Sequence, residues 1–409
     1  MSRAAPRRTY PSRSARPTRL LRLALACALL CGAGSSAARS PSQVQTIAVG
    51  RSAAWASCEG IEPDNSSRAR GMFPRAAEVR FRMRVVGGIG QAPASDELGN
   101  LLIAHGEPRL SKLDPRGHSL WSARLPSEAS CPPTLLSSGS ILIVTRDADA
   151  LVFQASGKLH VKRFLPLTDS RRRTFAIPTT SGGALIASGT DLLELDANGG
   201  LVRQARARGN VTALAESGAG LVAISENGSV EVARASGDFE LVGSLGGTVP
   251  EGGALQAGKV LAVVDAHKLV SLDLSTGQAL ILATDPALSL SGPPALFDNQ
   301  GSALVADGGL VSVRAADGAE TLRVSVAAAS LAFDAAARGL RSALVITDGA
   351  GGVAATRSGN DALLLNPDGT TRRLDNSACL DPFRPTPIQG GIVFSCRSGQ
   401  LFVVSDQAP

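Results

Sequence analysis

The residues with the clearest chemistry in this chain are its cysteines, and the chemistry they favour is disulfide formation. Two of the six cysteines lie within the first 38 residues, and the other four are Cys58, Cys131, Cys379 and Cys396. In an exported chain an even number of cysteines predicts disulfides, here two bonds with three possible connectivities. No cysteine has the Cys-x-x-Cys or Cys/His spacing of a zinc site.

The other residues that could do chemistry are isolated from one another. The histidines are His105, His118, His160 and His267. His105 and His267 could face the same side, but a metal site would need further ligands that the sequence does not supply. Asp147-Ala148-Asp149 begins like a calcium loop and lacks the glycine and distal glutamate of that motif. Nucleophilic-serine and phosphate-loop motifs are absent as well. The sequence therefore predicts no catalytic, cofactor-binding or metal site.

One cluster of like charge stands out after the first 38 residues. Arg171, Arg172 and Arg173 follow one another in a segment between two repeats. The cluster suits the docking of an anionic partner or polymer, and a solvated loop is the alternative reading. The chain's only tyrosine is Tyr10, so the aromatic platforms of a carbohydrate site are scarce after that point.

The beginning of the chain has the composition of an export signal. Residues 1–38 hold seven arginines and no acidic residue, and they include the apolar run Leu20–Leu30 followed by Ser36-Ala37-Ala38. Small residues in this pattern suit signal peptidase, and the apolar run is shorter than the roughly 20 residues of a spanning helix. We expect an extracytoplasmic protein, periplasmic or secreted. A retained anchor and lipidation at Cys27 or Cys31 are the alternatives.

The formal charge of +6 belongs to this leader. Without its seven arginines the chain holds 34 basic residues against 35 acidic ones. A near-neutral body lacks the electrostatic footprint of a nucleic-acid-binding protein. Residues 39–77 are rich in Ser, Ala, Arg and Pro without a sustained period, and we interpret them as a partly disordered extension or linker tethered through Cys58.

A repeated unit occupies the rest of the chain. Leu113–Trp121 joins two short strands through an Asp-Gly turn, and the same unit recurs at the turn glycines Gly117, Gly157, Gly199, Gly237, Gly277, Gly318 and Gly369. Successive gaps are 40, 42, 38, 40, 41 and 51 residues. Four short strands in each such period is the pattern of a β-propeller blade. Aspartates beside these glycines are typical turn residues.

Counting the repeats predicts the number of blades. An eighth repeat begins at Pro385 and stops at Ser405 after three strands, whereas Val79–Val85 alternates apolar residues with arginine and has no hairpin partner before it. Closing the ring with this N-terminal strand would remove an exposed sheet edge. We therefore predict an all-β, eight-bladed propeller over residues 78–409, with seven blades as the alternative. The longest gap predicts an insertion around Gly339–Gly352.

The propeller suggests how the cysteines pair. The start of a blade's first strand and the end of its second lie on the same face, which places Cys379 near Cys396. Cys58 would then pair with Cys131 and hold the extension over one face. The distance condition for such a bond is a Cα separation within roughly 7 Å.

The unit Leu-Asp-x-x-Gly-x-x-Leu-Trp at residues 113–121, together with its repetition, resembles the repeats of quinoprotein-dehydrogenase-like (PQQ-like) propellers. The resemblance covers most of residues 78–409. This family has a non-catalytic branch that includes an outer-membrane-protein assembly lipoprotein. Its enzymes hold a quinone with vicinal cysteines, calcium and a tryptophan floor. Here no cysteines are adjacent and only Trp55 and Trp121 occur, so no cofactor is expected.

These observations lead to one functional expectation and one alternative. We expect an exported, non-enzymatic and monomeric scaffold that binds a protein partner or polymer at the cell envelope, without a transmembrane span after signal cleavage. The alternative is a propeller enzyme, either a degenerate quinoprotein or a lyase or hydrolase that uses residues of the central channel.

Overall fold

The structure is a computed structural model, and it describes residues 69, 72–76, 78–169, 172–234, 237–284, 290–296, 301–306, 309–314, 320–325, 344–348, 352–356, 362–367, 370–376 and 378–406. The chain divides into two units, Met1–Ile47 and Ala48–Pro409, and all of the described residues belong to the second. The predicted signal peptide, Cys58 and most of the predicted insertion around Gly339–Gly352 lie outside the described residues.

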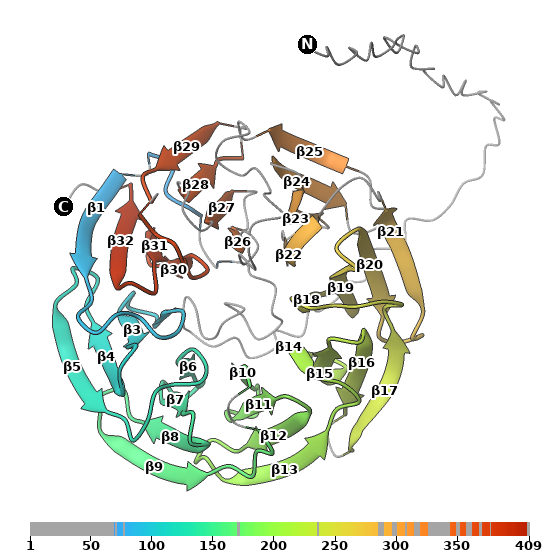
Figure 1. The fold of residues 1–409 in the computed structure, drawn as a ribbon, viewed down its shortest axis with the longest axis horizontal. Helices are drawn as coiled ribbons and strands as arrows, with labels where there is room; N and C mark the ends of the chain where they lie inside the picture. Colours follow the sequence, from blue (N-terminus) through green and yellow to red (C-terminus); the bar gives the residue numbers. More distant parts are fainter. Residues whose placement is uncertain are drawn as a thin grey trace, which may run out of the picture. The chain divides into compact units, whose positions relative to one another are not determined.

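The described strands form eight four-stranded antiparallel sheets, which follow one another around a ring as the blades of a propeller (Figure 1). In blades 1 to 7 the strands run outwards in sequence order. Blade 1 contains β2 (Ala94–Ser95), β3 (Leu101–Ala104), β4 (Arg109–Leu113) and β5 (Ser119–Arg124). Blade 2 contains β6 (Thr134–Leu135), β7 (Ile141–Val144), β8 (Asp149–Phe153) and β9 (Leu159–Phe164). Blade 3 contains β10 (Thr174–Pro178), β11 (Ala184–Ser188), β12 (Asp191–Leu195) and β13 (Leu201–Arg206). Blade 4 contains β14 (Val211–Ser217), β15 (Gly220–Ser225), β16 (Ser229–Ala233) and β17 (Phe239–Ser244).

The remaining blades complete the ring. Blade 5 contains β18 (Gly253–Gln256), β19 (Lys259–Val264), β20 (Lys268–Asp273) and β21 (Ala279–Thr284). Blade 6 contains β22 (Leu290–Leu296), β23 (Gly301–Ala306), β24 (Gly309–Arg314) and β25 (Glu320–Ser325). Blade 7 contains β26 (Leu344–Thr347), β27 (Val353–Thr356), β28 (Ala362–Leu365) and β29 (Thr371–Leu374). Blade 8 contains β30 (Thr386–Ile388), β31 (Gly391–Ser395), β32 (Gln400–Ser405) and β1 (Glu78–Arg84).

Blade 8 confirms the predicted closure. β1 pairs antiparallel with β32, with Phe81 opposite Val403 and Arg84 opposite Gln400. The two ends of the propeller thus share one sheet, which leaves β32 no open edge. Phe81 and Met83 pack towards blade 1, whereas Arg82 lies over the ring of Phe402 in the direction of blade 7.

The core lies between the blades, because each sheet is covered on both faces by its neighbours. The second strand of blade 2 shows the consequence: Ile141 and Ile143 pack against blade 1, whereas Leu142 and Val144 pack against blade 3. A strand buried on both faces needs a continuous apolar run, as these four residues provide. Comparable clusters join blades 3 to 4, 4 to 5, 5 to 6, 7 to 8 and 8 to 1.

The glycine turns have the chemistry expected of them. In the first turn, one carboxylate oxygen of Asp114 accepts hydrogen bonds from the backbone N–H groups of Arg116 and His118, both at 2.8 Å. Trp121 packs between blades, as the repeat pattern predicts: its indole Nε1 donates to the carbonyl oxygen of Ala155 at 3.0 Å, and its ring covers Gly157.

Replacing Gly157 with alanine should destabilise the propeller more than the same change at Gly139. Both glycines have positive φ angles, 85° and 77°. A Cβ at Gly157 would lie 2.6 Å from Cδ2 of Trp121, whereas a Cβ at Gly139 would meet nothing within 4 Å. We expect a backbone cost of about 1–2 kcal/mol in both variants and a further cost of about 1–3 kcal/mol from overpacking at Gly157. Urea unfolding of the two variants measures the difference, and equal losses would contradict this role for the indole.

The described part of the extension has an anchor that the sequence did not indicate. Ala69 and Phe73 are buried in the cluster between blades 7 and 8. The backbone N–H of Ala69 donates to the carbonyl oxygen of Thr347 at 2.7 Å, and that of Phe73 to the carboxylate of Asp348 at 2.8 Å. Burial of Phe73 therefore holds this segment in addition to the predicted tether at Cys58, which lies outside the described residues.

Strand direction gives the ring two faces. Loops between first and second strands lie on the same side as the loops between third and fourth strands, which carry the described repeated turn glycines, and we call this side the glycine-turn face. Loops between second and third strands and between blades carry Cys379 and Cys396, and we call this side the disulfide face. Among the described residues, no helix has the length and apolar character needed to cross a membrane.

Candidate functional site

The disulfide face carries the predicted bond between Cys379 and Cys396. Their Cα atoms are 5.7 Å apart, which satisfies the distance condition. Cys379 lies in the loop that leads into blade 8 and Cys396 follows its second strand, as the strand argument requires. This pairing is confirmed. Cys131 is fully buried in the cluster between blades 2 and 3, and its predicted partner Cys58 lies outside the described residues, so that bond stays a prediction.

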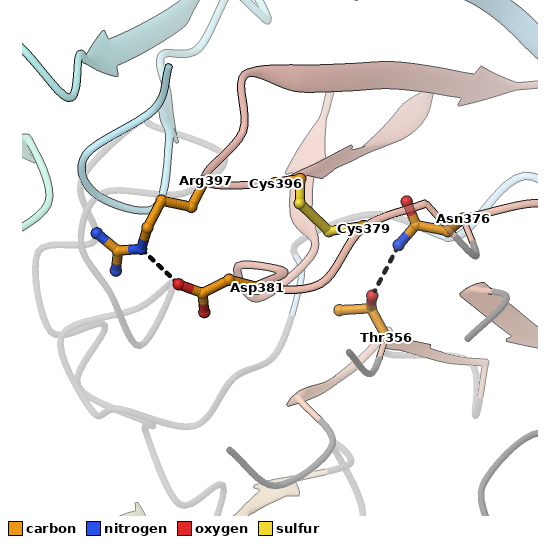
Figure 2. The surroundings of a disulfide bond; sticks show 6 residues. All are labelled: Thr356, Asn376, Cys379, Asp381, Cys396 and Arg397. Carbon is orange, nitrogen blue, oxygen red and sulfur yellow. Dashed lines mark hydrogen bonds and ion pairs between the residues drawn. A yellow bond between two sulfur atoms is a disulfide. The ribbon is translucent and has the colours of Figure 1, made fainter. Parts of the chain in front are cut away.

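The loop that contains Cys379 is fastened at several further points (Figure 2). Asn376 donates to the hydroxyl of Thr356 in blade 7 at 3.2 Å. Asp381 forms an ion pair with Arg397, whose guanidinium also donates to the carbonyl oxygen of Gly90 at 3.3 Å. Contacts to blades 7, 8 and the segment before blade 1 therefore hold this loop in a defined position.

Leu380 is the most exposed apolar side chain of that fastened loop. It lies between Cys379 and Asp381, and 73% of its surface is exposed. Burial of a large apolar side chain is favourable, so a mobile loop usually folds to shield it from water. Here the disulfide and the Asp381–Arg397 pair hold the neighbouring residues, so that Leu380 remains at the surface of the disulfide face.

The centre of the ring carries charge on the same face. A cavity of about 30 Å³, room for about one water molecule, is lined from five blades by residues that include Arg173, Glu251 and Arg384. These three residues precede the innermost strands of blades 3, 5 and 8. Arg173 lies over the ring of Phe175, with 4.7 Å between the guanidinium carbon and the ring centroid. We call this set the channel mouth, and its described lining residues include two arginines and one glutamate.

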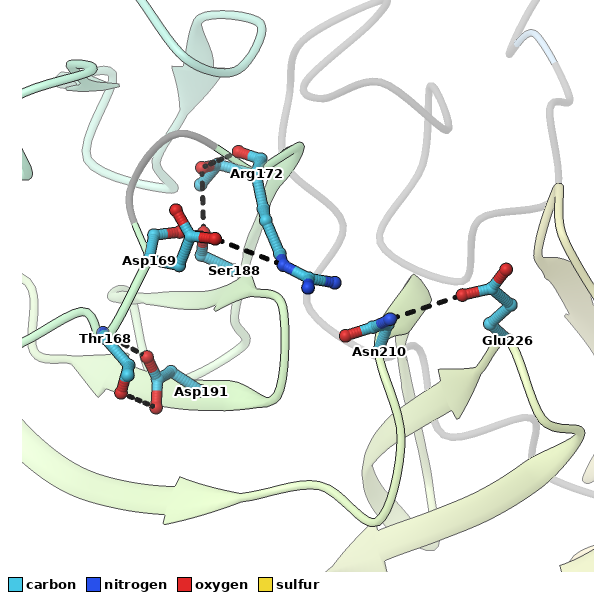
Figure 3. Close-up of polar contacts among 8 residues, drawn as sticks. Thr168, Asp169, Arg172, Ser188, Asp191, Asn210 and Glu226 are labelled. Atoms are coloured by element: carbon cyan, nitrogen blue, oxygen red, sulfur yellow. Dashed lines mark hydrogen bonds and ion pairs between the residues drawn. The ribbon is translucent and has the colours of Figure 1, made fainter.

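The structure separates the arginines that the sequence places side by side. Arg171 lies outside the described residues. Arg172 turns to Asp169, with its Nε 3.2 Å from a carboxylate oxygen, and its side chain covers Gly189 (Figure 3). Only Arg173 lines the channel mouth. The described pair thus points in two directions, as consecutive residues that enter a strand do, and the docking role of Arg171, Arg172 and Arg173 stays a prediction.

The loop around Arg172 is held by carboxylates (Figure 3). Asp191 accepts hydrogen bonds from both the backbone N–H and the hydroxyl of Thr168. The Ser188 hydroxyl donates to the carbonyl oxygen of Asp169 at 2.9 Å. On the next blade, the Asn210 amide donates to Glu226 at 3.3 Å. Hydrogen bonds thus hold described parts of the loops that lead into blades 3 and 4.

Sequence reasoning missed Leu380, Glu251 and Arg384 as site residues. Leu380 and Arg384 come from the loop that leads into blade 8, Glu251 comes from the loop that leads into blade 5, and none belongs to a recognisable motif. The one available signal was the adjacency of Leu380 to a cysteine that was expected to form a disulfide. The two histidines expected on one side, His105 and His267, do both follow second strands and lie on the disulfide face. In the described part of the chain, no three His, Cys, Asp or Glu side chains come together as a metal site.

Comparison with known proteins supports the fold alone. The sequence matches no protein-family model, and no curated protein sequence matches it significantly. The computationally designed Ika8 protein is similar in structure, with a TM-score of 0.60 and 14% identity over 79% of this chain and 97% of that one. Virginiamycin B lyase from Staphylococcus aureus aligns with a TM-score of 0.50 and 10% identity over 80% and 98% of the two chains. BamB from Moraxella catarrhalis aligns with a TM-score of 0.40 and 13% identity over 80% and 99%.

Proposed function

We propose that this chain is an exported, non-enzymatic propeller that binds a protein partner at the cell envelope through its disulfide face, with Leu380 as the central contact. The observation that most directly supports this proposal is the exposure of Leu380 on a loop that a disulfide and an ion pair hold in place. Side chains held in their bound position lose little conformational entropy on association, which favours affinity. The adjoining Arg384 belongs to the residue types enriched at interfaces.

Two further features support the proposal. Disulfides persist in oxidising compartments, so the bond at Cys379 agrees with export, as the leader composition does. A fixed apolar contact on the same face as a charged channel mouth suits a folded or extended protein segment with an apolar anchor and an acidic flank. The PQQ-like identity and the non-catalytic branch remain part of this proposal, on the strength of the repeat unit around Gly117.

Site-specific photo-crosslinking tests the proposal. A photoreactive residue in place of Leu380, with the protein expressed in its native envelope, should give a discrete protease-sensitive adduct. Arg384→Glu in the same chain should weaken that adduct because it reverses the charge of the channel mouth. The matched control is Leu120, which is 52% exposed on the outermost strand of blade 1. Adducts of equal yield at both positions, no adduct at Leu380, or an adduct that proteases leave intact would contradict a protein partner at this face.

A further inference from the structure

One position of the repeat is anomalous in blade 1. In each blade, the residue that starts the third strand faces the residue that ends the fourth. In blade 3 these are Asp191 and Arg206, whereas in blade 1 they are two arginines, Arg109 and Arg124. The corresponding pairs elsewhere are Asp149–Phe164, Ser229–Ser244, Lys268–Thr284, Gly309–Ser325, Ala362–Leu374 and Gln400–Arg84. Like charges directly opposite one another destabilise a sheet, so blade 1 has an electrostatic cost that the other blades avoid.

Blades 2 and 3 show how a carboxylate at this position is used. Each has an aspartate there, with a cation close by. Asp149 lies 2.9 Å from Nζ of Lys162, and Asp191 lies 3.6 Å from Nε of Arg206. These carboxylates are largely buried and neutralise the outer strand's cation. Blade 1 has Arg109 in place of the aspartate, and the nearby carboxylate of Glu107 pairs with Arg109 rather than with Arg124.

Blade 1 has space where that carboxylate is missing. A cavity of about 400 Å³ is lined by Glu107, Pro108, Arg109, Ser122 and Arg124, within the volume range of small-molecule sites. Oε1 of Glu107 lies 3.0 Å from Nη2 of Arg109, but the geometry of this contact is not that of a hydrogen bond. Arg124 forms no ion pair with any residue that the structure describes. Two cations against one anion leave the cavity with a net positive charge.

We propose that this cavity binds the carboxylate group of a small organic acid between Arg109 and Arg124. Guanidinium groups bind carboxylates through paired N–H donors in a geometry that a point charge cannot match. The ligand would supply the negative charge that Asp191 supplies in blade 3. It would also relieve the repulsion between the two arginines, so that binding stabilises the folded chain.

A chain of hydroxyl groups connects this cavity to His105. The Ser122 hydroxyl, at the cavity, is 3.2 Å from that of Ser111, which is 2.9 Å from Nε2 of His105. Nδ1 of His105 donates to the carbonyl oxygen of Val86 at 3.0 Å, since a carbonyl can only accept. The Ser111 hydroxyl donates to that of Ser122, so its single proton is not available to Nε2. This direction therefore matches the protonated ring, in which Nε2 donates to Ser111 and Ser122 keeps its own proton for a bound carboxylate. In the neutral ring Nε2 accepts the Ser111 proton, and the Ser111→Ser122 hydrogen bond is lost.

The environment of His105 sets the pH range of this effect. Burial lowers the pKa of His105 below its usual 6.5, and the nearby Arg109 lowers it further, while the Val86 carbonyl and Glu107 act in the opposite direction. The unfolded chain therefore binds more protons, so the stability that His105 contributes is complete above its ordinary pKa and is lost as the pH falls below it. A bound carboxylate favours the protonated ring, and its affinity should rise on acidification.

Calorimetric titration of the full-length exported protein at low salt tests the proposal, with succinate, acetate and inorganic phosphate as probes. We expect saturable succinate binding that weakens at least tenfold in Arg124→Gln. The Arg109→Asp variant should not bind succinate. Its melting temperature should be no lower than that of the native chain, because the substitution recreates the Asp–Arg pair of blade 3. Arg206→Gln is the matched control and should bind as the native chain does. The affinity gain between pH 8 and pH 6 should disappear in Ser111→Ala, which breaks the hydroxyl chain.

Three results would overturn the proposal. The first is the absence of saturable binding of either carboxylate by the folded native chain. The second is succinate binding that Arg124→Gln or Arg109→Asp leaves unchanged. The third is phosphate binding in preference to succinate, which would assign the two arginines to a different class of anion.

Discussion

Phe394→Ala is expected to lower the free energy of unfolding by about 3–5 kcal/mol, the usual range for removing a buried phenylalanine. Phe394 is 1% exposed, and its ring stacks on that of Phe402 with 5.0 Å between centroids. Both rings belong to blade 8. The guanidinium carbon of Arg82 in β1 lies over the Phe402 ring, 4.9 Å from its centroid. The cavity left by the missing ring would therefore weaken the sheet in which the two ends of the propeller meet. Equilibrium unfolding in urea, followed by circular dichroism, measures the loss.

Phe164→Ala is the matched control for that variant. Phe164 ends the outermost strand of blade 2 and is 70% exposed. Its removal should change the free energy of unfolding by no more than about 0.5 kcal/mol. If the two variants lost the same stability, burial between blades 7 and 8 would not be what holds the closing blade.

The double variant Cys379→Ser/Cys396→Ser should lose about 3 kcal/mol of stability, the expected contribution of a bond that closes a loop of this length. The two cysteines are 17 residues apart. The missing bond gives the unfolded chain more conformations, and it loosens the segment that presents Leu380. We expect at least the same loss when the native chain is unfolded with a reductant present, and any remaining effect of reductant on the double variant would report the predicted Cys58–Cys131 bond.

This variant also separates folding from function. The loop would keep the Asp381–Arg397 pair and the Asn376–Thr356 hydrogen bond, so that the propeller still closes while Leu380 becomes mobile. Crosslinking through position 380 should then fall more than stability alone accounts for. Undiminished crosslinking in a folded double variant would show that the disulfide does not position the proposed contact.

The candidate site was only partly predictable. The Cys379–Cys396 bond followed from strand order, because two loops on one side of the same sheet must lie close together. The docking role of the Arg171–Arg173 cluster stays a prediction, but the directions of Arg172 and Arg173 were not predictable, because side-chain direction depends on the local backbone and on the carboxylates nearby. Asp169 takes Arg172 away from the channel mouth, and nothing in the linear order of residues shows this.

The sequence by itself determined the architecture of this protein. Glycine turns at a regular interval, apolar second strands and an alternating segment at Val79–Val85 each reflect local physical chemistry, namely turn geometry and the burial of sheet faces. They were sufficient for the blades and for closure by β1. Tertiary structure alone decided which residues from distant repeats meet: Arg173, Glu251 and Arg384 at the channel mouth, and Arg109 opposite Arg124 beside a cavity. Such neighbours arise from the closure of the ring and from strand register, which bring together residues that share no sequence pattern.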